Sequence, residues 1–288
     1  MRICESIEEM RGACRAARQG GRRLGFVPTM GALHEGHLSL VRAARASCQV
    51  VAASIFVNPT QFGPQEDLAK YPRSFERDRA LLEKEGVELL FAPSVEEMYP
   101  AGAVTWVVVE GLSEKLDGRS RPGHFRGVTT VVAKLFHIVE PEAAFFGQKD
   151  AAQVAIIRRM ARDLDFPVEI VACPILREAD GLAMSSRNAY LDSEHRKQAR
   201  VLHRALMRVK ELWEGGERDA ARLVAIGREE MAREKSVLLD YLEIVDVDSL
   251  DAVVSAGEGA LVAVAAWVGT TRLIDNIVLG SLLVSQRV

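Results

Sequence analysis

The stretch Leu24-Gly25-Phe26-Val27-Pro28-Thr29-Met30-Gly31-Ala32-Leu33-His34-Glu35-Gly36-His37 predicts a strand, a turn and the start of a helix. Its apolar run ends at Val27, and a run typical of a helix follows over residues 38–46. The first N–H groups of a helix lack intrahelical partners, and the helix dipole favours negative charge there. The two histidines lie three residues apart, so both can face the same anion. The segment predicts a phosphate site, with a histidine pair that merely caps the helix as the structural alternative.

Up to about residue 173, short β-branched runs alternate with helical patterns. Strands are expected at 24–27, 50–56, 89–91, 105–109, 143–146 and 168–172, and helices at 38–46, 75–84, 129–139 and 151–164. The runs 50–56 and 143–146 are continuously apolar, which is typical of strands buried on both faces of a parallel sheet. The pattern predicts an α/β fold with a Rossmann-like doubly wound parallel sheet. Ligands of such sheets bind outside the carboxyl ends of the strands.

The pattern changes after Pro174. Helices are expected from Ser193 to about residue 214 and over 219–235, and strands at 240–245, 260–268 and 272–279. These elements predict a smaller C-terminal α+β lid domain. The expected boundaries are 1–175 for the Rossmann-like domain and 176–288 for the lid.

Composition is that of an ordinary globular protein. The 288 residues are 48% hydrophobic and 27% charged, with a net charge of −3, which favours neither a nucleic-acid partner nor a membrane surface. The apolar run 260–268 is too short to span a bilayer, and residues 1–10 do not resemble a signal peptide. Four scattered cysteines fit reduced, buried side chains. A cytoplasmic protein is expected.

Polar residues follow several of the expected strands. Asn58 and Gln61 offer carboxamides, and Lys149 stands beside a glycine at an expected helix start, where a cation suits phosphate. Residues 119–127 hold a cluster of cations that fits either a ligand site or a solvated loop. A polar segment with a fixed cation, Met184-Ser185-Ser186-Arg187-Asn188, comes much later. The Gly-x-Ser-x-Gly, P-loop and Gly-x-Gly-x-x-Gly motifs are missing from the sequence, so nucleotidyl transfer by electrostatic clamping is the favoured chemistry.

These motifs also carry a family resemblance. His34-Glu35-Gly36-His37 is similar to the HxGH signature of the nucleotidyltransferase superfamily, and Met184–Asn188 to its second, KMSKS-type signature. Within that superfamily the chain resembles the pantoate–β-alanine ligase family. The resembling segments are Val27–His37, Phe56-Val57-Asn58-Pro59-Thr60-Gln61-Phe62-Gly63, Phe145-Phe146-Gly147-Gln148-Lys149-Asp150 and Arg177–Asn188. One departure is Arg187, which stands where lysine is usual in a KMSKS-type loop.

The resemblance implies ATP-dependent condensation of (R)-pantoate with β-alanine through a pantoyl adenylate, with release of pyrophosphate and AMP. It implies that His37, His34 and Lys149 are catalytic, with His37 the expected proton donor. The implied ATP-binding positions are Pro28, Thr29, Met30, Gly31, Ala32, Leu33, His34, Glu35, Gly36, His37, Gly147, Gln148, Lys149, Asp150, Leu176, Met184, Ser185, Ser186 and Arg187.

For the other substrates, the resemblance implies that Gln61 binds pantoate and β-alanine and that Gln153 binds pantoate, with Asn58 as a further candidate. Mg²⁺ is expected on the phosphates. Asp78 is a candidate metal ligand, against the alternative of a carboxylate on a helix surface. A homodimer is also implied.

Two other functions stay open at this point. One is a different HxGH enzyme, such as an adenylyltransferase or a truncated synthetase-like protein. The other is a nucleotide-binding regulatory module without catalysis. Exchange of pyrophosphate into ATP that depends on pantoate, and on no amino acid, would distinguish the favoured interpretation from both.

Overall fold

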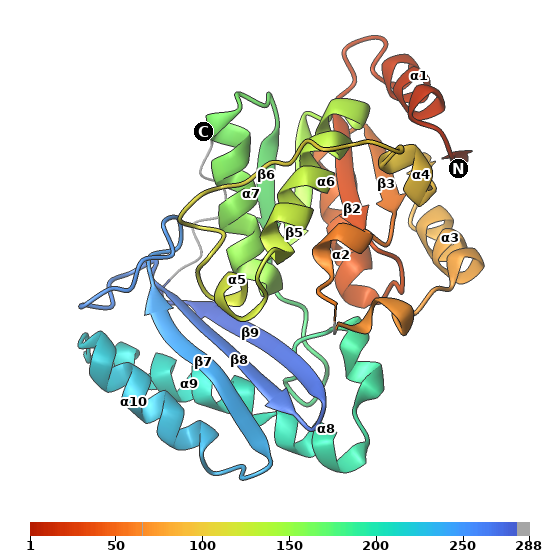
Figure 1. The fold of residues 1–288 in the computed structure, drawn as a ribbon. Coiled ribbons are helices and arrows are strands. Elements are labelled where there is room, and N and C mark those ends of the chain that lie inside the picture. Colours follow the sequence, from red (N-terminus) through yellow and green to blue (C-terminus); the bar gives the residue numbers. More distant parts are fainter. Residues whose placement is uncertain (65, 281–288) are drawn as a thin grey trace.

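A computed structural model describes residues 1–64 and 66–280 (Figure 1). Residues 281–288 of the expected lid domain lie outside the described residues. The strands are β1 Arg2–Cys4, β2 Leu24–Thr29, β3 Val50–Ile55, β4 Leu89–Phe91, β5 Ala143–Gly147, β6 Glu169–Cys173, β7 Val237–Val245, β8 Leu261–Val268 and β9 Thr271–Val278. The α-helices are α1 Ile7–Ala17, α2 Glu35–Ser47, α3 Phe75–Lys84, α4 Val95–Met98, α5 Asp117–Ser120, α6 His124–Val139, α7 Ala151–Asp163, α8 Ser193–Ala199, α9 Val201–Glu214 and α10 Ala220–Met231. Four 3₁₀ turns are η1 Pro59–Gln61, η2 Asp67–Ala69, η3 Gln148–Asp150 and η4 Ser186–Tyr190.

The predicted α/β fold is confirmed. Six parallel strands form one sheet in the order β1-β4-β3-β2-β5-β6. The chain winds outward from β2 through β3 and β4 on one side and reaches β5 and β6 on the other. The topological switch point therefore lies between β2 and β5, and ligands of open α/β sheets bind at the carboxyl ends of such strands. The two segments that leave this edge are the turn before α2 and the turn η3.

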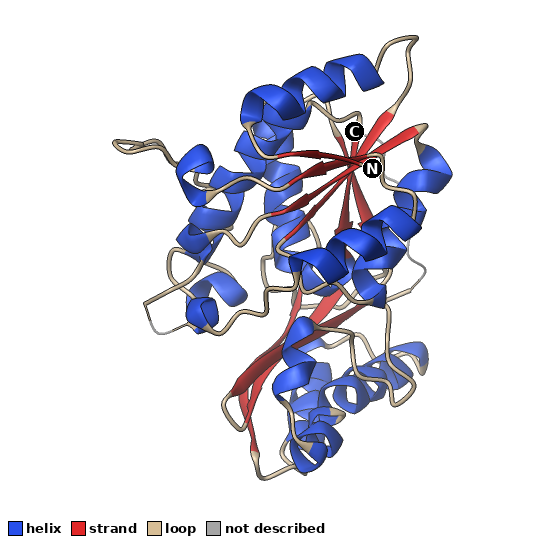
Figure 2. Cartoon of the chain, turned by 90° about the vertical axis from the view of Figure 1, so that its right-hand side faces the viewer, coloured by secondary structure: helices blue, strands red, loops and turns tan. Residues whose placement is uncertain are grey.

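Helices cover both faces of the parallel sheet (Figure 2), and alternate side chains of its strands enter two separate cores. Phe26 and Ala52 belong to the cluster packed with α1, α6 and α7, whereas Val27 and Ala53 belong to the cluster packed with α2. This alternation follows the two-residue period of a strand. Both faces of the sheet are thus covered, as the continuously apolar runs predicted.

A second sheet, of three antiparallel strands in the order β7-β8-β9, lies below the first in Figure 1. β8 is buried on both faces because its alternate residues enter different cores. Leu261, Ala263 and Ala265 join the cluster that contains α6 and α7, and Val262 and Val264 join the cluster that contains α9 and α10. We call the parallel sheet with its helices the first unit, and the chain after β6, which includes the antiparallel sheet, the second unit. The two units therefore share a hydrophobic core. Within the described residues, no helix has both the length and the apolar composition that crossing a membrane requires.

The structure corrects three expected elements and adds two, β1 and α1, that were not expected. Residues 105–109 do not form a strand among the described residues, because the Val107 backbone is bonded instead to Thr129 and Thr130 side chains of α6. α6 begins at His124, five residues before the expected start, and the helix expected from Ser193 is capped by Asp192 and divides at Arg200 into α8 and α9.

Candidate active site

The turn after β2 is held by a buried carboxylate. Asp78, on the first turn of α3, is 1% exposed, and its oxygens accept hydrogen bonds from the backbone N–H groups of Ala32 at 2.7 Å and Leu33 at 2.9 Å. Gly31 and Ala32 have φ angles of +82° and +51°, a left-handed conformation that favours glycine and costs about 1 kcal/mol or more elsewhere. Asp78 thus stabilises a strained turn just before the histidines.

This burial excludes the alternative that Asp78 is a carboxylate on a helix surface, and its metal role stays a prediction. Both of its oxygens already accept backbone hydrogen bonds. The same bonds occupy the N–H groups of Ala32 and Leu33, and the Leu33 side chain is in the core. Contact of these two residues with ATP would need other atoms. Among the residues that the structure describes, no group of three or more His, Cys, Asp or Glu side chains could hold a metal ion.

His34 and His37 lie side by side at the N-terminus of α2, with ring centroids 4.1 Å apart. The His34 backbone N–H donates to Nδ1 of His37 at 3.3 Å, so the neutral His37 ring carries its proton on Nε2. Burial and the adjacent His34 ring lower the pKa of His37 to about 3, and burial together with the Lys149 ammonium lowers the pKa of His34. Both rings are neutral hydrogen-bond donors near pH 7.

Gly36 separates the two histidines for a steric reason. A Cβ atom at this position would lie 2.9 Å from Cε1 and Nδ1 of the His34 ring. The same Cβ would lie 3.6 Å from Cβ of Met184, which begins the second signature segment. The two motifs, far apart in the sequence, therefore meet at Gly36.

The second segment is carried by a hairpin over residues 176–184. Arg177 and Ala183 form an antiparallel bridge, and the Met184 N–H donates to the Leu176 carbonyl at 3.0 Å. Ser185 then caps η4, because its Oγ accepts from the Arg187 N–H at 3.3 Å. The hairpin explains how Leu176 and Met184, eight positions apart, come to the same place.

Charged groups converge on this point from both units. Lys149 Nζ lies 3.3 Å from the Asp150 carboxylate. Burial alone would raise the pKa of Asp150, but Lys149 and then Arg187 hold it below its usual range. Arg187 is therefore close enough to act on Asp150, although it belongs to η4. Lys149, Asp150, Arg187 and the histidine pair form one electrostatic cluster.

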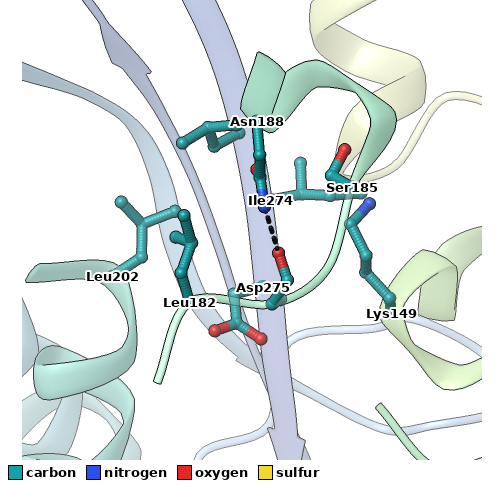
Figure 3. Close-up of a pocket in the computed structure, with 9 residues that line it drawn as sticks. Lys149, Leu182, Ser185, Asn188, Leu202, Ile274 and Asp275 are labelled. Atoms are coloured by element: carbon teal, nitrogen blue, oxygen red, sulfur yellow. Dashed lines mark hydrogen bonds between the residues drawn. The ribbon is translucent and has the colours of Figure 1, made fainter. Parts of the chain in front are cut away.

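A cavity separates Lys149 from the second unit (Figure 3). Lys149 and Ser185 face it from one side, and Asp275 of β9 lines its base. Asn188 closes another wall and donates to the Ala183 carbonyl at 3.1 Å. The cavity lies between η3 and η4, so it is bounded by residues of both predicted nucleotide segments.

Gln61 is oriented by Asn58. Asn58 is 1% exposed; its Nδ2 donates to Gln61 Oε1 and to the Gly127 carbonyl, each at 3.1 Å, and its Oδ1 accepts from Thr60 and Tyr99. Every polar atom of the Asn58 side chain is thus bonded within the protein, so the structure favours positioning over the substrate contact expected of it. Nε2 of Gln61 contacts the Met30 sulfur at 3.1 Å, which brings the Gln61 donors to the turn after β2.

Within the cation cluster of residues 119–127, Arg121 and His124 are half-buried and bonded inside the protein, whereas Arg119 and Arg126 are exposed. Arg121 pairs with Glu66 at 2.6 Å and donates to Nε2 of His124 at 3.0 Å, so Nδ1 of His124 donates to the Gln61 carbonyl at 2.8 Å. Burial and the Arg121 guanidinium lower the pKa of His124 to about 4. The cluster holds the Gln61 backbone in place.

Three other predicted residues have different surroundings. Gln153 lies in the first turn of α7, half-buried, one turn beyond Lys149. The Glu35 carboxylate pairs with Arg42 at 2.8 Å on the surface of α2. Gln148 is buried, and its Nε2 donates to Asn276 of β9 at 3.3 Å. The structure thus brings Gln153 near the cluster, while the Glu35 and Gln148 side chains serve contacts within the protein.

Sequence reasoning missed the residues that hold the site from a distance. Asp275 and Asn276 of β9 contact Arg177 and η3, respectively. The only sequence signal was a pair of polar residues inside the apolar run 272–279. A buried polar residue in such a run must find partners, but the sequence does not name them.

The comparisons with known proteins cover nearly the whole chain. The family model for pantoate-beta-alanine ligase matches residues 2–278. A pantothenate synthetase of Koribacter versatilis is 62% identical over 97% of this chain and 96% of its own, and one of Thermotoga neapolitana is 58% identical over 97% and 100%.

Solved structures of the same family also match this chain over nearly its whole length. A pantothenate synthetase from Thermus thermophilus matches with a TM-score of 0.91 at 50% identity, over 96% of this chain and 99% of that one. A pantoate-beta-alanine ligase from Francisella tularensis, solved with beta-gamma ATP and beta-alanine, matches with a TM-score of 0.79 at 32% identity, over 96% and 97%. The chain belongs to the pantoate–β-alanine ligase family.

Proposed function

We propose that the ATP-dependent condensation of pantoate with β-alanine, which this enzyme catalyses, proceeds in two steps at the carboxyl edge of β2 and β5. The pantoate carboxylate attacks the α-phosphate of ATP, and pyrophosphate leaves. The β-alanine amine then attacks the acyl carbonyl of pantoyl adenylate, forms the amide bond, loses a proton and expels AMP. The observation that carries the proposal is the meeting of the two signature motifs at Gly36, with Lys149 and Arg187 in the same electrostatic cluster.

The first step requires a carboxylate to approach an anionic phosphate, so the main task is to offset charge. Lys149 supplies a fixed cation. His37, neutral and protonated on Nε2, can donate to a phosphate oxygen without the loss of a solvated charge. We assign His37 as the donor to the leaving phosphates and His34 as its neighbour in phosphate binding. Met184, Ser185, Ser186 and Arg187, with the Leu176 backbone, would hold the nucleotide from the other side.

Gln61 would orient the acid substrates. Its Oε1 accepts from Asn58, which leaves the Nε2 group directed toward the turn after β2 and able to donate to a pantoate oxygen. Gln153, one turn into α7, would contact pantoate from the opposite side. Because an amide that loses its partner is costly in a buried site, these contacts would also select the substrate.

Mg²⁺ fits this site only as a companion of the triphosphate. Each Asp78 oxygen is already engaged by a backbone donor in the turn, and Asp150 is a carboxylate within the cluster. Mg²⁺ commonly binds through one or two carboxylates and the substrate phosphates. When bound, it would offset phosphate charge, and Asp150 is the residue placed to meet it. A titration of Mg²⁺ into the enzyme without ATP should show no binding at millimolar concentration.

Closure of the second unit over the site would protect the acyl adenylate from water. Its hairpin, residues 176–184, and η4 carry the groups that would cover the nucleotide. Adding ATP and pantoate should slow proteolysis within residues 176–190. Equal cleavage with and without the substrates would argue against a lid.

The central test uses two half-reactions. Pantoate-dependent exchange of pyrophosphate into ATP reports adenylate formation, and pantothenate production reports the whole reaction. His37→Ala and Lys149→Ala should each slow exchange by about 100-fold or more, because each removes a group aimed at the phosphates. Arg42→Gln, on the outer face of the same helix, is the control and should keep normal exchange. Near-normal exchange in either variant would remove that residue from the mechanism.

A homodimer is the proposed assembly. Val104, Trp106 and Val108 are 81%, 43% and 51% exposed, and they alternate along an extended segment, a pattern that suits pairing with a second copy. Val104→Lys combined with Val108→Lys should give a monomer by sedimentation velocity, and an unchanged dimer would place the interface elsewhere. The four cysteines are unpaired and buried, which supports a reducing, cytoplasmic location; fractionation of source cells would test this.

A further inference from the structure

Two neighbouring residues of β9, Asp275 and Asn276, contact the segments that carry the two halves of the nucleotide site. We call this pair the β9 bracket. Both side chains are almost fully buried, at 3% and 2% exposure. β9 is paired along its length with β8, so the bracket rests on a regular strand rather than on a loop. Sites supported by regular elements are held more precisely than sites supported by loops alone.

Asn276 holds the turn that carries Lys149. Its Nδ2 donates to the backbone carbonyls of Gln148 and Lys149, each at 2.9 Å, and its Oδ1 accepts from Gln148 Nε2 at 3.3 Å. Both amide hydrogens of Asn276 are thus donated to carbonyls of η3. The carbonyl of Lys149 is fixed, so the direction in which the lysine side chain leaves the backbone is fixed with it.

Asp275 holds the hairpin of residues 176–184, which carries the other half of the nucleotide site. Its carboxylate accepts two hydrogen bonds from the Arg177 guanidinium, at 2.6 and 2.9 Å, and Arg177 also donates to the Gly181 carbonyl at 3.1 Å. Arg177 lies in the hairpin of residues 176–184, which leads into Met184. A bidentate pair of this kind fixes orientation as well as distance. Asp275 therefore anchors the base of the second signature segment.

We propose that the β9 bracket is a positioning device for adenylate formation: Asn276 aims Lys149 at the phosphates, and Asp275, through Arg177, places the hairpin that holds the nucleotide. Successive side chains of a strand point in opposite directions, so one strand can reach both segments at once. Each residue acts through another one, because the Asn276 amide is bonded to η3 and the Asp275 carboxylate, which lines the cavity, is bonded to Arg177. The proposal rests on the role proposed above for Lys149, and its test separates the two.

The first test is Asn276→Asp, which keeps the shape and the acceptor for Gln148 but removes both donors. Because a displacement of about 1 Å in a reacting group can cost about 100-fold in rate, we expect pantoate-dependent exchange to fall at least tenfold. The KM for ATP should rise while the KM for β-alanine stays unchanged. A purely structural defect would lower the active fraction in both half-reactions and leave both KM values alone.

The second test is a double-mutant cycle with Lys149→Ala. If Asn276 acts by aiming Lys149, Asn276→Asp should have almost no further effect once the lysine side chain is gone. A loss that multiplies with that of Lys149→Ala would overturn the proposal, as would normal exchange in Asn276→Asp alone. Full activity of Lys149→Ala by itself would refute the phosphate role of the lysine, and the aiming role of Asn276 with it.

Controls address folding and the contact between units. Glu243→Gln removes the charge that pairs with Arg119 between β7 and α5, a different contact across the same boundary, and should keep normal kinetics. Asp275→Asn should raise the KM for ATP at least fivefold, and an unchanged KM would remove Asp275 from the bracket. If Asn276→Asp does not fold, Asn276→Ala replaces it in the same cycle. Failure of both to fold would overturn the proposal, because Asn276 would then be required for folding rather than for aiming.

Discussion

Replacing Asp78 by alanine should destabilise the protein and impair catalysis together. The carboxylate is 1% exposed and accepts the N–H groups of Ala32 at 2.7 Å and Leu33 at 2.9 Å. A hydrogen bond to a charged group contributes about 1.5–3 kcal/mol, so the loss of two should lower the free energy of unfolding by about 3–6 kcal/mol. Asp78→Asn keeps one acceptor oxygen and should lose about half as much.

Urea unfolding at pH 7 measures the stability, and pantoate-dependent exchange measures the site. Glu76→Gln is the matched control: it removes a carboxylate from the same first turn of α3, but an exposed one that pairs with Arg79. Its effect should stay within about 0.5 kcal/mol. If Asp78→Ala unfolds like the wild type and instead needs more Mg²⁺ for activity, Asp78 binds metal and the positioning role is wrong.

Three further outcomes are expected. The folded pKa values of His37 and His124 are about 3 and about 4, below the usual 6.5, so the stability from their neutral rings is complete above about pH 6.5 and declines as the pH falls toward those values. Urea unfolding should therefore show a lower free energy of unfolding at pH 5 than at pH 7. An equal value at both pH values would contradict the burial of these rings. Gly36→Ala should keep the fold, by circular dichroism, but slow exchange at least tenfold, because its Cβ would lie 2.9 Å from the His34 ring; normal exchange would mean that the ring moves without consequence. Gln61→Ala should raise the KM for pantoate at least tenfold, and unchanged pantoate kinetics would exclude the contact.

The sequence predicted the architecture well where burial decided it. The runs over 50–56 and 143–146 are apolar on both faces, and they became β3 and β5 in the middle of the sheet. Residues 105–109 have the same β-branched composition, yet their polar backbone groups bond to threonines of α6, which are distant in sequence. The start of α1 carries a local signal that could have predicted this helix, namely the capping box between Ser6 and Glu9.

The candidate site was predictable only in its local parts. Residue type and spacing are enough to predict the histidine pair, Lys149 and the Met184–Arg187 segment. The residues that support them were not predictable in this way, because their hydrogen bonds join distant positions. Asp78 is bonded to Leu33, 45 positions away, and Asn276 to Lys149, 127 positions away. Such contacts depend on how the elements pack, and a single sequence does not contain that information explicitly.

β9 also links the site to the packing between the two sheets. β9 is the last strand of the described residues, and one face of its sheet shares a core with α6 and α7. Loss of β9 would remove both the proposed bracket and the cover for that core. One strand thus couples the packing of the two sheets to the geometry proposed for adenylate formation.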